Sequence, residues 1–237
     1  MNAHFAPIAL AAHADGPALA RALAAGVAEA LRARLARDGA AGLAVSGGRT
    51  PVAFLKTLAG EPLDWTRIAV TLVDERWVPE TSERSNAALV RRHLLKGAAA
   101  AARFVPLFTG DPTPEAGLAA ATAAVASLPA RFAAVVLGMG DDGHTASFLP
   151  GAKALAAAID PAGTAPLTIV RAPAANEPRL TFTLPRLVAA DRLFLHIEGM
   201  AKRAVLERAR AGTDAAELPI RAVLNTLRSP LDVFWSP

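Results

Sequence analysis

The chain has 237 residues, of which 53% are hydrophobic and 19% are charged, with a formal net charge of +4. This length can bury the core of one large domain, and no stretch of about 18 strongly apolar residues predicts a transmembrane helix. The absence of cysteine excludes disulfides, thiolate metal sites and cysteine nucleophiles, while the scattered basic residues lack the run that is typical of a nucleic-acid groove.

The N-terminal segment contains Ala-His-Ala at residues 12–14, a pattern of small residues that occurs at signal-peptidase sites. No Lys or Arg precedes it, and the apolar stretch ahead of it is very short. We therefore expect no secretion signal. A cytoplasmic location agrees with this and with the lack of cysteine.

The first half of the chain predicts alternating helices and strands. Apolar residues recur at helical spacing over residues 16–39, and a glycine closes that segment. The apolar start of residues 42–51 predicts a strand that breaks into glycines, and a helix follows over residues 51–60. Residues 67–79 then predict one strand that ends in charged residues, followed by a helix over residues 85–95.

The second half repeats this order. Residues 114–129 predict a helix and residues 132–140 a strand, and a further strand (192–199) and helix (200–212) come later. Strands that alternate with helices predict an α/β fold, with a Rossmann-like, mostly parallel, doubly wound sheet and helices on both faces. No long repeat or linker divides the chain, so we expect a single domain over residues 1–237.

Polar and small residues follow three of the expected strands. In open α/β sheets ligands bind beyond the carboxyl ends of the strands, so we expect these residues to meet at one rim. They are Ser46 to Thr50, Asp74 to Arg76, and Asp141 to His144.

The loop Ser-Gly-Gly-Arg-Thr-Pro, residues 46–51, has the outline of an anion site. Glycines let backbone N–H groups approach a ligand, and the positive end of the following helix dipole points into the same space. A tight turn is the other interpretation of this loop, and by itself the more common one. Its spacing matches neither a Walker loop nor a dinucleotide fingerprint, which disfavours ATP and NAD, and we expect no cofactor.

His144 is the strongest candidate for a catalytic residue. It follows two aspartates in a glycine-rich loop, where a carboxylate can set the tautomer of the imidazole. The other histidines lie in a terminal segment, a helix or a strand without glycines; they are His4, His13, His93 and His196. Asp74, Asp142 and His144 could form a metal-ligand set, but no typical ligand spacing supports one, and we expect no metal.

The charged residues 74–76 allow two interpretations as well. Charged groups at strand ends commonly form solvated ion pairs. Here Asp74 directly follows a buried apolar run, and an apolar Trp-Val-Pro segment comes next. We favour a functional role for this strand end.

Together these segments resemble the 6-phosphogluconolactonases, of the glucosamine/galactosamine-6-phosphate isomerase superfamily, which hydrolyse 6-phosphogluconolactone in the oxidative pentose phosphate pathway. The most specific family pattern is GMGxDGHTASxFP, from which only the order of Phe148 and Leu149 departs. The resembling segments span Ser46 to Lys202 and are SGGRTP, TLVDERWVP, SNAALVRRHLL, LGMGDDGHTASFLPG, PRLTFTLPRL and EGMAK.

The resemblance implies roles for individual residues. The substrate phosphate would lie on Ser46, Gly47 and Gly48 and be held by Arg179 and Lys202, although without the resemblance Lys202 reads as a solvated lysine at a helix start. His144 would act as the general base toward water, with Asp142 or Asp74 orienting the imidazole or the nucleophile. Arg76 would stabilise the oxyanion, and the reaction needs no covalent nucleophile, metal or cofactor.

Two alternatives remain, a related enzyme and a protein of a different class. A glucosamine-6-phosphate deaminase shares the phosphate loop and the Asp-Gly-His element, but it carries a glutamate where this chain has Leu149 and usually reads Asp-Glu-Tyr where this chain has Arg76. A sugar-phosphate sensor would lose His144 and add a DNA-binding extension. The expected partner is a small phosphorylated sugar lactone, with no nucleic acid and no membrane, and we expect a monomer or weak homodimer.

Overall fold

A seven-stranded parallel sheet forms the centre of the protein. The computed structural model of the chain describes residues 8–173, 175–226 and 231–237, and in these residues the strand order of the sheet is β1-β10-β9-β6-β2-β3-β5. All neighbouring strands run parallel, which confirms the predicted sheet. The strands are β1 (Ile8–Ala12), β2 (Ala41–Val45), β3 (Ile68–Leu72), β5 (Arg103–Val105), β6 (Ala134–Gly138), β9 (Arg192–Glu198) and β10 (Leu231–Ser236).

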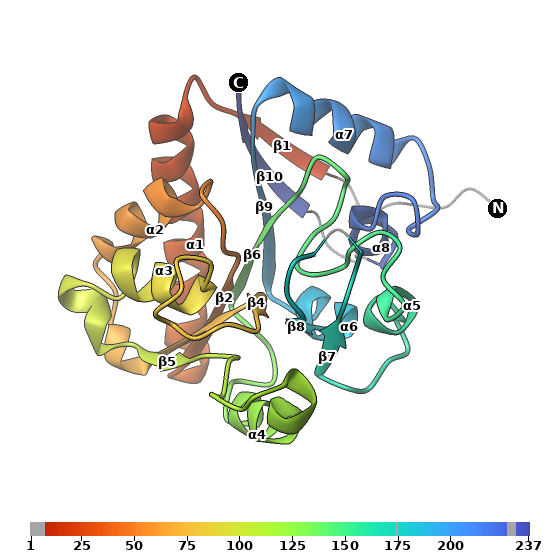
Figure 1. The fold of residues 1–237 in the computed structure, drawn as a ribbon. Coiled ribbons are helices and arrows are strands. Elements are labelled where there is room, and N and C mark those ends of the chain that lie inside the picture. The colour runs from red at the N-terminus through yellow and green to blue at the C-terminus, as the bar shows by residue number, and fades with distance from the viewer. Residues whose placement is uncertain (1–7, 174, 227–230) are drawn as a thin grey trace.

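Helices cover both faces of this sheet, as predicted. Figure 1 shows α1, α2 and α3 on one side and α5 to α8 on the other. None of the helices in the described ranges is long and apolar enough to cross a membrane. The helices are α1 (Gly16–Asp38), α2 (Val52–Ala59), α3 (Asn86–His93), α4 (Pro114–Ala126), α5 (Leu155–Ala158), α6 (Leu184–Val188), α7 (Met200–Arg210) and α8 (Ile220–Thr226), with short 3₁₀ turns η1 (Trp65–Arg67) and η2 (Gly97–Ala101).

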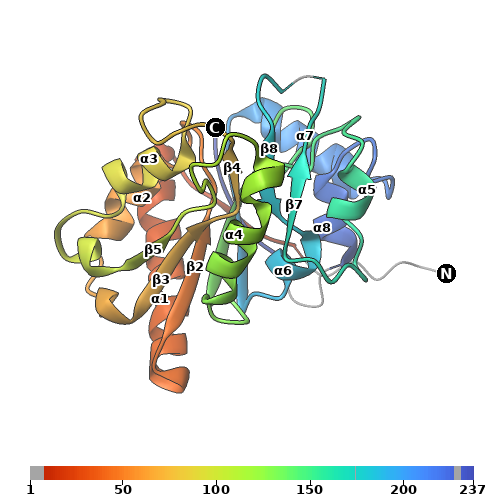
Figure 2. The same cartoon turned by 60° about the horizontal axis from the view of Figure 1, so that its bottom comes forward.

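A second, antiparallel sheet consists of β4 (Asp74–Arg76), β8 (Arg179–Phe182) and β7 (Leu167–Val170). The single strand predicted over residues 67–79 is therefore wrong. The chain leaves the parallel sheet at Val73, whose N–H donates to Val45 and whose carbonyl accepts from Phe182. β3 and the first two residues of β4 are both buried, so the sequence gives no signal that the strand ends between them. Figure 2 shows β7 and β8 on the same side as α5 and α6.

Local signals explain the boundaries of the first helix. The side chain of Asp15 accepts a hydrogen bond from the N–H of Ala18 at 2.7 Å, which satisfies one free donor at the start of α1. Gly39 ends the helix in the left-handed conformation, and its N–H donates to the carbonyl of Leu35. Residues 1–7, on which part of the expectation about a secretion signal rests, lie outside the described ranges.

The order of the strands reverses between β2 and β6. From β2 the chain proceeds outward to β3 and β5, returns to β6 on the other side of β2, and continues to β9 and β10. A crevice forms beyond the carboxyl ends of the strands at such a switch point, and ligands bind there. The fully buried β2 and β3 hold the base of this crevice in the core.

Candidate active site

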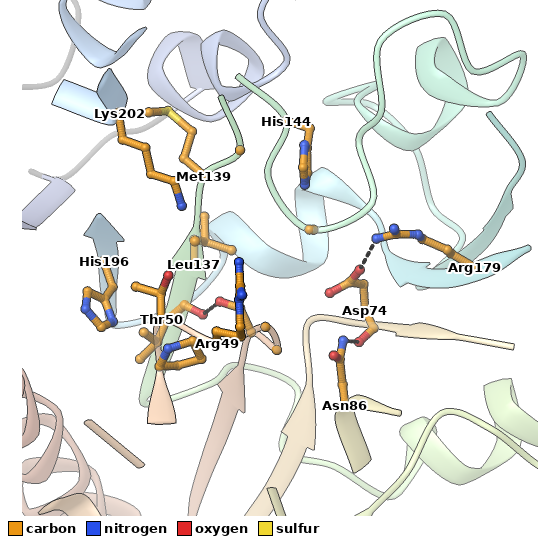
Figure 3. Close-up of a pocket in the computed structure, with 18 of the residues that line it drawn as sticks. Arg49, Thr50, Asp74, Asn86, Leu137, Met139, His144, Arg179, His196 and Lys202 are labelled. Atoms are coloured by element: carbon orange, nitrogen blue, oxygen red, sulfur yellow. Dashed lines mark hydrogen bonds and ion pairs between the residues drawn. The ribbon is translucent and has the colours of Figure 1, made fainter. Parts of the chain in front are cut away.

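A pocket of about 290 Å³ lies at this switch point. It is lined by residues that lie in or directly after β2, β4, β6, β8 and β9, and Figure 3 shows side chains converging from these separate elements. The lining residues named in the sequence analysis are Ser46, Gly47, Gly48, Arg49, Thr50, Asp74, Arg76, His144, Arg179, His196 and Lys202. All three predicted strand ends thus contribute to one pocket, although Glu75, Asp141, Asp142 and Gly143 are not among its lining residues.

The anion loop is anchored to the neighbouring strand. Both the backbone N–H and the hydroxyl of Ser46 donate to the carbonyl of Val136 in β6, at 3.0 and 2.6 Å. A Cβ atom on Gly47 would lie 1.8 Å from Oδ1 of Asn86, so only glycine fits at this position. Helix α2 begins directly after the loop, and its N-cap residue Pro51 lines the pocket, so the positive end of the helix lies at the pocket.

His144 is paired with Asp142. Nδ1 of the imidazole lies 2.5 Å from Oδ1 of Asp142, and the N–H of His144 also donates to this oxygen at 3.2 Å. The hydrogen bond from His144 holds the pKa of the Asp142 carboxyl below its usual value. A Cβ on Gly140 would lie 2.3 Å from the imidazole, so glycine at this position makes room for the ring.

Asp74 contacts other groups. Its Oδ2 accepts a hydrogen bond from the hydroxyl of Ser147 at 2.6 Å and lies 3.7 Å from Nη1 of Arg179. Asp74 lines the pocket but forms no hydrogen bond or ion pair with His144. Of the two aspartates that the sequence left open, Asp142 is the one in contact with the imidazole.

Four cationic side chains line the pocket, and they differ in whether another group of the protein is bonded to them. Nη1 of Arg76 donates to the carbonyl of Arg84 at 2.6 Å, and Arg179 faces Asp74. Lys202 and Arg49 form no ion pair or hydrogen bond with the side chains that the structure describes. In Figure 3 Lys202 and Arg179 flank the pocket from opposite sides, and Arg49 extends between them.

Sequence reasoning missed His196. This residue of β9 lines the pocket, although its sequence context, a strand without glycines, predicts no role in the site. Nε2 of its imidazole lies 3.0 Å from Oε1 of Glu198, and burial together with nearby Lys202 lowers its pKa against the effect of Glu198. Its place near the end of a parallel strand was the signal that could have identified it.

The two other histidines that the structure describes, His13 and His93, do not line the pocket. His13 follows β1 and stacks on Phe234 with ring centroids 5.5 Å apart, and His93 ends α3. His4 lies outside the described residues. Over the described ranges, no group of three or more His, Asp or Glu side chains is arranged to hold a metal ion.

Leu149 does not occupy the position that the comparison with deaminases assumed. It is buried in the hydrophobic core, with 7% of its surface exposed, and is not one of the residues that line the pocket. Phe148 is buried in the same core, so the lack of a carboxylate at Leu149 does not distinguish this site from that of a deaminase.

Comparisons with known proteins agree with this architecture. The model of the family "Glucosamine-6-phosphate isomerases/6-phosphogluconolactonase" matches residues 14–235. A protein of Rhizobium meliloti named 6-phosphogluconolactonase is 52% identical over 93% of this chain and 95% of its own length. A crystal structure of a 6-phosphogluconolactonase from Shewanella baltica aligns with a TM-score of 0.94 at 35% identity, covering 97% of this chain and 98% of that chain.

A more distant likeness concerns the fold alone. The structure of a monomeric glucosamine-6-phosphate deaminase aligns with a TM-score of 0.73 over 97% of both chains, at 16% identity. At this identity the shared fold carries no information about the reaction.

Proposed function

The chain belongs to the family of glucosamine-6-phosphate isomerases and 6-phosphogluconolactonases, and within it we infer that the protein is a 6-phosphogluconolactonase. It hydrolyses 6-phosphogluconolactone to 6-phosphogluconate, a step of the oxidative pentose phosphate pathway, as its named relatives indicate. The mechanism rests on one observation: the His144 imidazole lines the pocket, and the Asp142 carboxylate contacts its Nδ1.

His144 is the proposed general base. A carboxylate on Nδ1 accepts the N–H of the neutral imidazole, so that Nε2 carries the free lone pair. Nε2 takes a proton from water as the oxygen of this water attacks the lactone carbonyl. The bond between the carbonyl carbon and the ring oxygen then breaks, and the protonated imidazole returns the proton to the departing oxygen. One water is consumed, and the product is the open-chain acid.

Cationic side chains are assigned to the substrate phosphate and to the oxyanion that forms during the reaction. Arg76 is the proposed donor to the oxyanion that forms at the lactone carbonyl, because a positioned cation stabilises charge as it develops. The phosphate is assigned to the loop of Ser46, Gly47 and Gly48, with Lys202 and Arg179. A phosphate monoester carries nearly two negative charges at neutral pH, and Lys202, which has no ion-pair partner among the described residues, supports this assignment. Asp74, which contacts Ser147, would hold the turn that follows the base.

An assay of freshly generated 6-phosphogluconolactone tests this function. Acid release should exceed the spontaneous ring opening many-fold, and glucosamine 6-phosphate should release no ammonia. Ammonia release with negligible lactone hydrolysis would replace the proposal with a deaminase. Binding of both compounds without turnover of either would indicate a sugar-phosphate sensor.

We further propose that the chain acts as one domain over residues 1–237, as a monomer or weak homodimer in the cytoplasm. The lining of the pocket by residues from both halves of the chain supports a single domain. A phosphorylated sugar is charged and stays within a membrane-bounded compartment, which supports the location. The mixed pattern of charges supports a small molecule, and neither nucleic acid nor a membrane, as the partner. Analytical ultracentrifugation measures the oligomeric state.

A further inference from the structure

The side chain of Glu75 is wholly buried beneath the pocket. Asp74 and Arg76, its neighbours in β4, both line the pocket, and the alternation of side chains along a strand directs Glu75 the other way. None of its surface is exposed. An isolated buried carboxylate is costly, so such a group needs partners that satisfy it.

Hydrogen-bond donors from two segments surround this carboxylate. Oε1 accepts from the backbone N–H of Arg76 and of Asn86, both at 2.8 Å. Oε2 accepts from the backbone N–H of Ala87 at 2.8 Å and from the hydroxyl of Ser85 at 3.1 Å. Burial raises the pKa of Glu75 to about 7, and these hydrogen bonds oppose the rise. One carboxylate thus joins the β4 strand end to the first residues of α3.

Helix α3 has an N-cap of its own. The hydroxyl of Ser85 accepts a hydrogen bond from the N–H of Ala88 at 3.1 Å, and Ser85 has the extended backbone of an N-cap residue. Glu75 satisfies two further free N–H groups of this helix end, those of Asn86 and Ala87, and it also accepts from Arg76 outside the helix. The particular effect of these bonds is to fix the position of Asn86, the first residue of α3.

Asn86 connects this carboxylate to the anion loop. Its Nδ2 donates to the backbone carbonyl of Asp74 at 2.9 Å, and its Oδ1 fills the space above Gly47. Asn86 is buried and lines the pocket. A continuous set of contacts therefore runs from Arg76 through Glu75 and Asn86 to Gly47.

We propose that Glu75 is a positioning residue of the lactonase reaction, which sets the strand end of Asp74 and Arg76 relative to the anion loop at Gly47. This rests on the proposed function. The loop holds the phosphate end of the substrate, whereas Arg76 meets the carbonyl, so the distance between them matters most when the substrate reacts. A misplacement of about 1 Å at such a site costs on the order of 100-fold in rate.

Glu75→Gln is the main test, because glutamine keeps the shape but directs an NH₂ group at a backbone donor. We expect kcat to fall between about 10-fold and 100-fold, with the affinity for 6-phosphogluconate retained. Calorimetric titration with 6-phosphogluconate counts the folded, competent sites, so kcat can be expressed per site. A Glu75→Gln variant with wild-type kcat per site would overturn the proposal.

Ser85→Ala is the matched control. It removes the N-cap of the same helix and one donor to Oε2, but it leaves the bonds that Oε1 accepts from the backbone N–H groups of Arg76 and Asn86. We expect its kcat to stay near the wild-type value. An equal loss of kcat in Ser85→Ala would mean that helix capping alone explains the effect, and the positioning role would be wrong.

A double-mutant cycle combines Glu75→Gln with Asn86→Ala and measures the coupling of their effects on kcat. General destabilisation of the protein does not produce such a coupling. If Glu75 acts through Asn86, the double variant should be no slower than the slower single variant. Multiplicative losses would contradict this route. Wild-type enzyme without lactonase activity would refute the proposed function itself, whereas an active wild type with a fully active Glu75→Gln variant would refute the positioning role alone.

Discussion

Replacing Asp142 with asparagine measures what its 2.5 Å contact with the imidazole of His144 contributes to catalysis. Asparagine keeps the size of the side chain and removes its charge. A hydrogen bond to a charged group contributes about 1.5 to 3 kcal/mol. The Asp142 side chain is 50% exposed, so water competes with this contact and the lower part of that range applies. About 1.5 to 2 kcal/mol corresponds to a fall in kcat of roughly 10-fold to 30-fold.

The assay follows initial rates with freshly generated lactone at several concentrations, after subtraction of spontaneous ring opening. We expect kcat to fall and KM to stay, because the base acts in the transition state. Asp141→Asn is the control, since Asp141 is an exposed neighbouring carboxylate. The reasoning would be refuted if Asp142→Asn retained wild-type kcat, or if Asp141→Asn lost as much.

The same pair makes a prediction about stability. The bond from His144 lowers the pKa of folded Asp142 below the ordinary value of 3.8, so the unfolded chain binds more protons in the interval between the two pKa values. The stabilisation by this carboxylate is therefore present above 3.8 and is lost as the pH falls through the folded pKa. The difference in Tm between the wild type and Asp142→Asn should shrink in acid, and a difference that grows there would contradict this.

The remaining predictions concern the base, the phosphate site and the anion loop. His144→Ala should lower kcat by about 100-fold or more while 6-phosphogluconate still binds in calorimetry; near wild-type turnover would remove His144 from the mechanism. Lys202→Ala should raise KM with little change in kcat, and Arg49→Ala should do so to a smaller extent because its side chain is exposed; unchanged KM in both would relocate the phosphate. Gly47→Ala should cost about 1 to 3 kcal/mol of stability because its Cβ would lie 1.8 Å from Oδ1 of Asn86, and a Tm equal to that of the wild type would contradict the close packing.

Features that depend on neighbouring residues could be predicted from the sequence. Apolar periodicity revealed the long helices and most of the parallel strands, because burial of one face sets the period. The Asp142–His144 pair was also accessible, since the two residues are two positions apart in a glycine-rich turn. The rule that ligands bind at the carboxyl ends of parallel strands then indicated the rim where the pocket lies.

Only the tertiary structure decided which distant groups meet. Ser147 and Asp74 are 73 residues apart in the sequence yet form a hydrogen bond. Asp74 is therefore bonded to Ser147, and Asp142 is the aspartate that contacts the imidazole. Val73 divides one continuous apolar run between two sheets, and buried strands of either sheet have the same composition. The sequence around His196 is typical of a core strand. Only the order of the strands shows that this end of β9 lies at the pocket. Local pattern reports whether a side chain is buried, whereas its partner depends on how the strands are ordered in space, and that order is a property of the whole chain.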